Sequence, residues 1–157
     1  MKLHLLRHAK TEKQAISGRD FDRSLMEKGF RQSKEIAKFL ENKNWNNTLL
    51  FCSEAKRTRE TFAEIEKSAS FNEVSYKHNL YLAETKELLD FIWKLNSKQD
   101  LFILGHNDGL SEIASYFCGE EIHLKTCSYV CITFEANSSL EMSRETGMIV
   151  ETFRPEV

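Results

Sequence analysis

The chain has 157 residues, of which 41% are hydrophobic, and it contains only one Pro and six Gly. This composition is typical of a folded domain with a substantial core and excludes a tail or a linker array, so we expect one domain over residues 1–157. The formal net charge is -2, from 22 basic and 24 acidic residues, which provides no global positive field for nucleic acid or an anionic membrane. Any anion-binding site must therefore be local.

The N-terminal apolar run is too short for a secretory signal or a membrane span, and we expect a cytoplasmic protein. There are four cysteines, Cys52, Cys118, Cys127 and Cys131. No two of them have the Cys-x-x-Cys spacing. In a reducing compartment these residues are expected to be unpaired and to pack as small core side chains.

Short apolar runs rich in β-formers alternate with segments of helical periodicity along the chain. The predicted strands cover residues 2–6, 48–52, 74–81, 101–104, 129–134 and 148–153. The first predicted helix begins at a capping box over residues 24–27, the second follows Cys52, the third lies within 83–95, and the fourth is capped by Asn107 or Asp108 and ends before Gly119. The alternation predicts a three-layer α/β/α fold with a mostly parallel central sheet, in which ligands bind at the carboxyl ends of the strands.

Polar side chains follow three of the predicted strands at those ends. Arg7 and His8 follow the first strand, Ser53 and Arg57 follow the second, and His106 follows the strand at 101–104. Phosphoryl transfer needs an in-line nucleophile and fixed positive charge around the phosphate oxygens, and arginine binds such oxygens in pairs. The set therefore predicts a phosphate site in which His8 attacks while the arginines clamp. Asn107 and Ser53 are expected to contribute further donors around the substrate.

Three motifs in this order resemble those of the histidine phosphatase superfamily, also called phosphoglycerate mutase-like. Residues 6–9 (Leu-Arg-His-Ala) are similar to its Arg-His-Gly signature, and residues 53–61 (Ser-Glu-Ala-Lys-Arg-Thr-Arg-Glu-Thr) are similar to its Ser-Pro-Ala-x-Arg-Ala-x-Gln-Thr segment. Residues 105–107 (Gly-His-Asn) resemble its second-histidine motif. The resemblance implies a phosphoglycerate mutase-like fold and a covalent phosphohistidine on His8. It also implies a phosphate pocket formed by Arg7, Arg57 and His106, with no metal and no cofactor.

Within that superfamily, the short length and the segments at residues 22–25 and 80–83 resemble the small SixA-type phosphohistidine phosphatases. Larger relatives carry a general-acid glutamate at a position that falls near Leu82 in this sequence, which leaves Glu84 as the nearest carboxylate and the candidate acid. Because imidazole has a free pKa of about 6.5 and leaves as a neutral ring, a site without a positioned acid favours a phosphoramidate. Phosphohistidine in a protein is therefore the expected substrate, and small phosphomonoesters are the alternative. The resemblance implies that the phosphorylated protein is a histidine phosphotransfer domain.

Attack requires a neutral His8, and His106 is expected to contribute most when it is protonated. Other functions stay open. A cysteine phosphatase would need a Cys-x5-Arg loop, and the spacing from Cys52 to Arg57 is one residue short. A metal hydrolase would need a ligand spacing such as His-x-His, which is not present. A non-catalytic phosphate-binding module would use the same pocket without turnover, and a mutase would need insertions for which the chain is short.

Overall fold

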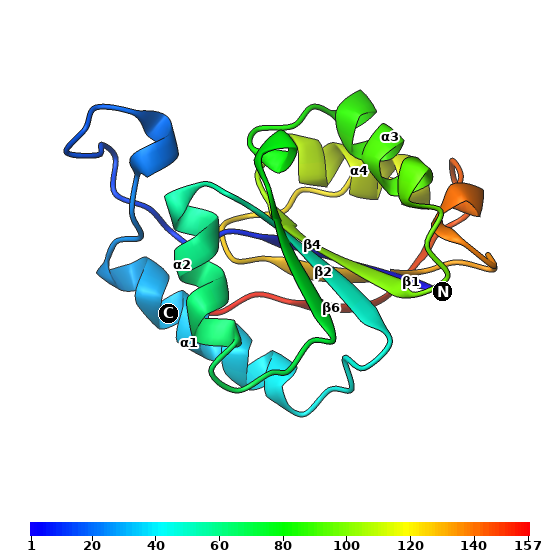
Figure 1. Cartoon of the computed structure of the whole chain (residues 1–157), viewed down its shortest axis with the longest axis horizontal. Coiled ribbons are helices and arrows are strands. Elements are labelled where there is room, and N and C mark those ends of the chain that lie inside the picture. Colours follow the sequence, from blue (N-terminus) through cyan, green and yellow to red (C-terminus); the bar gives the residue numbers. More distant parts are fainter.

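A computed structural model describes all 157 residues and shows a six-stranded sheet with helices on both faces (Figure 1). In chain order the strands are β1 (Lys2–Arg7), β2 (Thr48–Ser53), β3 (Glu73–Lys77), β4 (Asp100–Gly105), β5 (Tyr129–Thr133) and β6 (Met148–Phe153). The helices are α1 (Glu27–Glu41), α2 (Lys56–Ile65), α3 (Thr85–Leu95) and α4 (Gly109–Cys118). The predicted three-layer α/β/α class is confirmed.

The strand order across the sheet is β3-β2-β4-β1-β5-β6. Strands β3, β2, β4 and β1 pair in parallel, whereas β5 pairs antiparallel with both β1 and β6. Three of the five pairings are therefore parallel, as the alternation of strands and helices predicts. The carboxyl ends of β1, β2 and β4 meet at one edge of the sheet, and this edge carries the predicted site.

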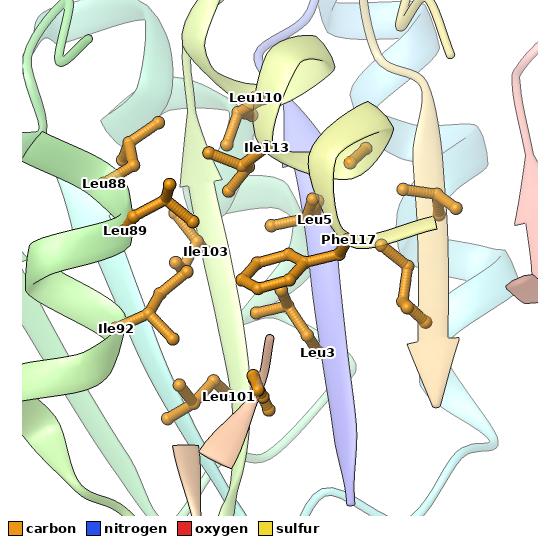
Figure 2. Packing of buried hydrophobic residues seen from close by; sticks show 14 of the residues in the cluster. Leu3, Leu5, Leu88, Leu89, Ile92, Leu101, Ile103, Leu110, Ile113 and Phe117 are labelled. Atoms are coloured by element: carbon orange, nitrogen blue, oxygen red, sulfur yellow. The ribbon is translucent and has the colours of Figure 1, made fainter. Parts of the chain in front are cut away.

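The central strands are buried on both faces, because successive side chains of a strand point to opposite sides. On one face, Leu3 and Leu5 of β1 pack with Leu101 and Ile103 of β4 beneath α3 and α4, as Figure 2 shows. Leu6 belongs to the cluster on the other face. The residues labelled in Figure 2 from the two helices are Leu88, Leu89, Ile92, Leu110, Ile113 and Phe117.

The second face is covered by α1 and α2, which lie together on the opposite side of the sheet from α3 and α4 (Figure 1). Its core combines aliphatic residues such as Ile36 with the aromatic rings of Trp45, Phe102 and Tyr129. His4 lies among these rings, 4.9 Å from Trp45 and 5.7 Å from Phe102 between ring centroids. This aromatic cluster thus contains a buried titratable group that is distant from the strand ends.

Two local predictions were wrong. The capping box at residues 24–27 does not form, because α1 begins at Glu27 with Met26 as its N-cap and without a side-chain hydrogen bond at the cap. The predicted strand at residues 74–81 ends at Lys77, and a 3₁₀ helix follows over His78–Leu80. This turn directs the next segment over the strand ends, which brings Tyr81 to the site described below.

All four cysteines are free, as expected, and Cys52, Cys127 and Cys131 are buried. Burial raises the pKa of the Cys52 thiol well above its usual range, which keeps it protonated and unreactive. None of the helices is both long and apolar enough to cross a membrane.

Candidate active site

The register of the sheet places the two predicted site histidines next to each other. Arg7 is paired with Gly105 across β1 and β4, so His8 and His106 leave the sheet side by side. The His8 backbone N–H donates to the Gly105 carbonyl over 3.1 Å, and the two imidazole rings lie 5.3 Å apart between centroids. Two motifs separated by almost one hundred residues are therefore joined by ordinary parallel pairing.

A polar pocket of about 920 Å³ opens at this edge of the sheet. Of the residues predicted for the site, Arg7, His8, Arg57, His106 and Asn107 line it. The charged side chains in its wall comprise five cations and two carboxylates. The cations are Arg7, Lys10, Lys13, Arg23 and Arg57, and the carboxylates are Glu12 and Asp20. Although the whole chain has a net charge of -2, this pocket has an excess of positive charge and suits an anion.

His8 is held in one tautomer. Its Nδ1 lies 2.8 Å from the Ala9 carbonyl oxygen, and a carbonyl can only accept, so Nδ1 carries the proton and Nε2 keeps its lone pair. Burial, aided by Arg57 and Arg7 and opposed by the Ala9 hydrogen bond, lowers the pKa of His8 to about 3. The ring is therefore neutral near neutral pH, with Nε2 available as a nucleophile.

His106 is buried beside His8, with its Nε2 2.8 Å from the Ser53 hydroxyl oxygen. Burial, with smaller contributions from His8 and Arg57, lowers its pKa to about 2. The expectation that His106 acts as a protonated ring is wrong for the free protein. A cation between His8 and two arginines would be desolvated and repelled, and sequence spacing alone does not reveal either cost.

The arginines of the pocket are only partly satisfied. Arg7 donates from Nη1 to the Leu124 carbonyl over 3.0 Å, and Arg57 is almost fully buried on the first turn of α2. The Nε atoms of both residues are buried without a hydrogen-bond partner, and the same is true of His106 Nδ1. These are the only three buried side-chain nitrogen or oxygen atoms in the chain that lack a partner. All three belong to residues that line one pocket.

Asp20, from the loop at residues 10–23, occupies one edge of Arg57. Arg57 donates from Nη2 to the Asp20 carboxylate over 2.9 Å and from Nη1 to its backbone carbonyl over 2.8 Å. Tyr81 and Arg23 also donate to this carboxylate, over 2.6 and 2.9 Å. Burial raises the pKa of Asp20, but these three donors outweigh it and hold the pKa well below its usual range. Asp20 is therefore ionised and is not a proton donor.

Asn107 lies in the pocket wall, but much of its hydrogen bonding is internal. Its Nδ2 donates to the Leu124 carbonyl over 2.8 Å, the same oxygen that accepts from Arg7, and its Oδ1 accepts from the Ser111 hydroxyl over 2.7 Å. Asn107 therefore ties the start of α4 to the segment around Leu124. Its predicted contact with substrate stays a prediction.

Glu84 and Ser53 do not line the pocket. Glu84 is the exposed N-cap residue of α3, where its backbone N–H donates to the Glu87 carboxylate, and it faces a separate depression. Leu82 lines both this depression and the phosphate pocket. Ser53 is fully buried at the end of β2 and contacts His106. The carboxylates in the pocket wall are instead Glu12 and Asp20.

The loop at residues 10–23 supplies most of the pocket residues that lie outside the three motifs. It is anchored by the bridge between Thr11 and Leu25 and by the hydrogen bond from Met26 N–H to the Lys10 carbonyl. A side chain at Gly29 would collide with that carbonyl, so glycine is needed at this contact. The mixed charge of the loop was the available signal for Asp20, whereas nothing in the sequence near Tyr81 indicates its hydrogen bond to that residue.

The model of the histidine phosphatase superfamily (branch 1) matches residues 3–86, more than half of the chain. An uncharacterized chloroplastic protein of Arabidopsis thaliana is 32% identical over 148 residues, which cover 87% of this chain and 68% of that protein. The chain belongs to the histidine phosphatase superfamily, and it is a phosphatase of that class.

Solved structures share the fold. A candidate phosphohistidine phosphatase SixA from Agrobacterium tumefaciens has a TM-score of 0.82 at 23% identity, with 98% of this chain and 97% of that chain covered. The protein histidine phosphatase SixA complexed with tungstate has a TM-score of 0.79 at 14% identity, with coverage of 98% and 97%. A phosphoserine phosphatase mutant from Entamoeba histolytica, in complex with phosphoserine, has a TM-score of 0.66 at 13% identity, with coverage of 96% and 95%. The phosphoglycerate mutase-like fold is thus confirmed.

Proposed function

We propose that the protein hydrolyses phosphohistidine in a partner protein through a covalent phosphohistidine on His8. The observation that supports this most is the set of three unpartnered buried nitrogens, Arg7 Nε, Arg57 Nε and His106 Nδ1, around one pocket. A buried donor without an acceptor costs about 1–3 kcal/mol, and natural proteins keep few of them. All three belong to residues that line the pocket, and a phosphoryl oxyanion bound there would provide the acceptors that the free protein lacks.

The first step is attack by His8 Nε2 on phosphorus. The new Nε2–P bond forms as the P–N bond to the substrate imidazole breaks, and Arg7, Arg57 and His106 hold the equatorial oxygens. If the other nitrogen of the substrate ring carries a proton, the leaving group departs as neutral imidazole and needs no acid. The ionised Asp20 in the pocket wall is compatible with such a leaving group.

The second step is attack by water on the phosphoryl group of His8. The P–Nε2 bond breaks and its electron pair returns to Nε2, while the water proton passes to the departing phosphate. Throughout, the Nδ1 proton stays on its hydrogen bond to the Ala9 carbonyl. A ring that is protonated at Nδ1 and phosphorylated at Nε2 is cationic, which makes it a good leaving group for this step.

The preference for a phosphorylated protein over a small metabolite is supported by the site and by the fold. The SixA proteins that share the fold are described as phosphohistidine phosphatases. The pocket is wide and open, and Lys10, Lys13 and Arg23 add positive charge beyond the phosphate clamp. A histidine phosphotransfer domain would present its phosphorylated ring to such a site. The predicted cytoplasmic location stays a prediction.

The decisive experiment measures phosphate release from a phosphohistidine protein and from a simple phosphomonoester, using wild type and His8→Ala. We expect faster release from phosphohistidine and no release by the variant. Wild type quenched in alkaline denaturant should retain a base-stable, acid-labile phosphoryl group that His8→Ala does not acquire. Phosphate binding without a trapped phosphoenzyme would instead support the non-catalytic binding module, and equal trapping on the variant would refute the role of His8.

The second candidate is a phosphatase of small phosphomonoesters. The observation that favours it is the Glu12 carboxylate in the pocket wall, which provides a candidate acid for an alkoxide leaving group. A phosphoserine phosphatase also shares the fold. Faster turnover of a phosphomonoester than of phosphohistidine, abolished by Glu12→Gln, would establish this function in place of the first.

A further inference from the structure

Ser53 is buried behind His106 and does not line the pocket. It is the last residue of β2, and it is 0% exposed. Its hydroxyl oxygen lies 2.8 Å from His106 Nε2. Of the two groups that the Ser53 hydroxyl contacts, Ala55 N–H and the His106 ring, only His106 belongs to a residue that lines the pocket.

The hydrogen-bond partners of the Ser53 hydroxyl determine which His106 nitrogen carries the proton. Ser53 Oγ accepts from the Ala55 backbone N–H over 3.3 Å, and its own proton has one acceptor within reach, His106 Nε2. If Nε2 carried the ring proton instead, the hydroxyl proton would be buried without an acceptor. The arrangement that satisfies both groups has Ser53 donating to Nε2, and the single proton of the neutral ring then lies on Nδ1.

In that tautomer His106 Nδ1 is a hydrogen-bond donor, like the arginine nitrogens beside it. Nδ1 is one of the three unpartnered buried nitrogens, and the other two, Arg7 Nε and Arg57 Nε, are permanent donors. A bare Nδ1 would instead direct a lone pair toward a bound anion. The groups around the ring are His8 at 5.3 Å and Tyr81 at 5.5 Å between ring centroids, the cations of Arg57 and Arg7, and the Asp20 carboxylate.

We propose that Ser53 is a positioning residue that holds His106 in its Nδ1–H tautomer, so that His106 binds a phosphate oxygen as a neutral donor through Nδ1. The inference rests on the proposed function for the identity of the anion. Burial keeps the ring neutral in the free protein, because it lowers the pKa of His106 to about 2. His106 therefore does not compete with His8 for a proton, and only the arginines supply positive charge at the phosphate.

Nitrogen NMR on uniformly ¹⁵N-labelled wild type tests the tautomer directly, because a protonated and a bare ring nitrogen have distinct shifts. In the free protein at pH 7 we expect His106 Nδ1 to be protonated and Nε2 to be bare, and inorganic phosphate should perturb Nδ1 more than Nε2. A proton on Nε2, or on both nitrogens, would overturn the proposal. A protein with the expected tautomer but no trapped phosphoenzyme on His8 would refute the proposed function and leave the tautomer established.

Two isosteric substitutions test which nitrogen contacts the anion. The amide nitrogen of Asn lies near the position of Nδ1, whereas that of Gln lies near Nε2. We expect His106→Asn to keep kcat/KM within roughly 10-fold of wild type and His106→Gln to lose on the order of 10²-fold, as His106→Ala does. The reverse order of Asn and Gln would contradict a contact through Nδ1.

A double-mutant cycle tests whether Ser53 acts through His106. Ser53→Ala should lower kcat/KM by roughly 10-fold in wild type and by less than about 3-fold in the His106→Asn background, where the ring is absent. Equal losses in both backgrounds would overturn the proposal. Ser33→Ala is the matched control, because Ser33 is equally buried but donates to the Gly29 carbonyl within α1, and it should leave kcat/KM unchanged.

Discussion

Two regions of the same sheet bury histidines, and they differ in how the polar atoms around these histidines are hydrogen-bonded. In the aromatic cluster, His4 Nδ1 lies 2.7 Å from the Tyr129 hydroxyl and the ring stacks on Phe102. In the pocket, His8 and His106 lie beside two arginines, and the three unpartnered buried nitrogens of the chain gather there. Burial lowers the pKa of all three histidines. A lowered histidine pKa therefore does not by itself identify a functional site, whereas unpartnered buried nitrogens beside the histidine do.

The largest expected effect is the loss of phosphate release when the pocket histidine His8 is replaced. His8→Ala should reduce phosphate release to background while the free energy of unfolding changes by less than about 1 kcal/mol, because the pocket residues are arranged for an anion rather than for packing. Activity assays and urea unfolding of the purified variant measure both quantities. Retained turnover in a folded His8→Ala protein would remove the nucleophile from the mechanism.

His4→Ala should give the opposite result. Loss of the ring leaves a cavity among Trp45, Phe102 and Tyr129 and an unpaired Tyr129 hydroxyl, which should lower the free energy of unfolding by about 2–4 kcal/mol. Below its unfolding transition, kcat/KM should remain within about twofold of wild type. A selective loss of turnover in a stable His4→Ala protein would mean that the two regions are coupled.

The next effect in size concerns the two edges of Arg57. Its Nη groups bind Asp20, while its Nε remains unpartnered. A lysine has a single ammonium and cannot serve both, so Arg57→Lys should lower kcat/KM by on the order of 10²- to 10³-fold, almost as much as Arg57→Ala. Steady-state kinetics on the phosphohistidine protein measures this, and near-wild-type activity in the lysine variant would show that point charge alone suffices.

Acid should weaken the fold through all three buried histidines. In the unfolded chain they take up protons as the pH falls through about 6.5, whereas His4 and His8 in the folded protein resist until about pH 3. The unfolded state therefore binds more protons between these pH values. The free energy of unfolding decreases as the pH is lowered, by up to ~1.4 kcal/mol per pH unit for each histidine. Urea unfolding at pH 7, 6 and 5 measures the slope. His8→Ala should have a shallower slope than wild type, and a stability that is constant over this range would contradict the burial of neutral rings.

The smallest expected effects distinguish the carboxylates near the site. Glu84 is exposed and outside the pocket, so Glu84→Gln should change kcat/KM by less than about twofold on either class of substrate. Glu12→Gln should do the same on phosphohistidine and should lower turnover of a phosphomonoester by roughly 10²-fold if Glu12 supplies the proton. Parallel kinetics on the two substrates measures both variants. A large loss in Glu84→Gln would restore Glu84 as the acid that the sequence suggested.

The sequence by itself determined the layered fold and the strand ends that carry Arg7, His8, Arg57 and His106. Both depend on local signals, since apolar periodicity sets the elements and parallel pairing brings strand ends together. The shortened third strand and the absent capping box were missed because both places contact segments distant in sequence. His78, in the 3₁₀ turn, packs against Phe21, and the Met26 N–H donates to the Lys10 carbonyl.

Only the tertiary structure decided how the site residues are satisfied. It placed Asp20 on Arg57, Ser53 beneath His106, and Glu84 outside the pocket. It also decided that His106 is neutral, because the cost of a charge depends on burial and on the groups around it, here the His8 ring and the cations of Arg57 and Arg7, from three different segments of the chain. Residue types and their order are local properties, whereas solvation and hydrogen-bond partners are properties of the packed molecule.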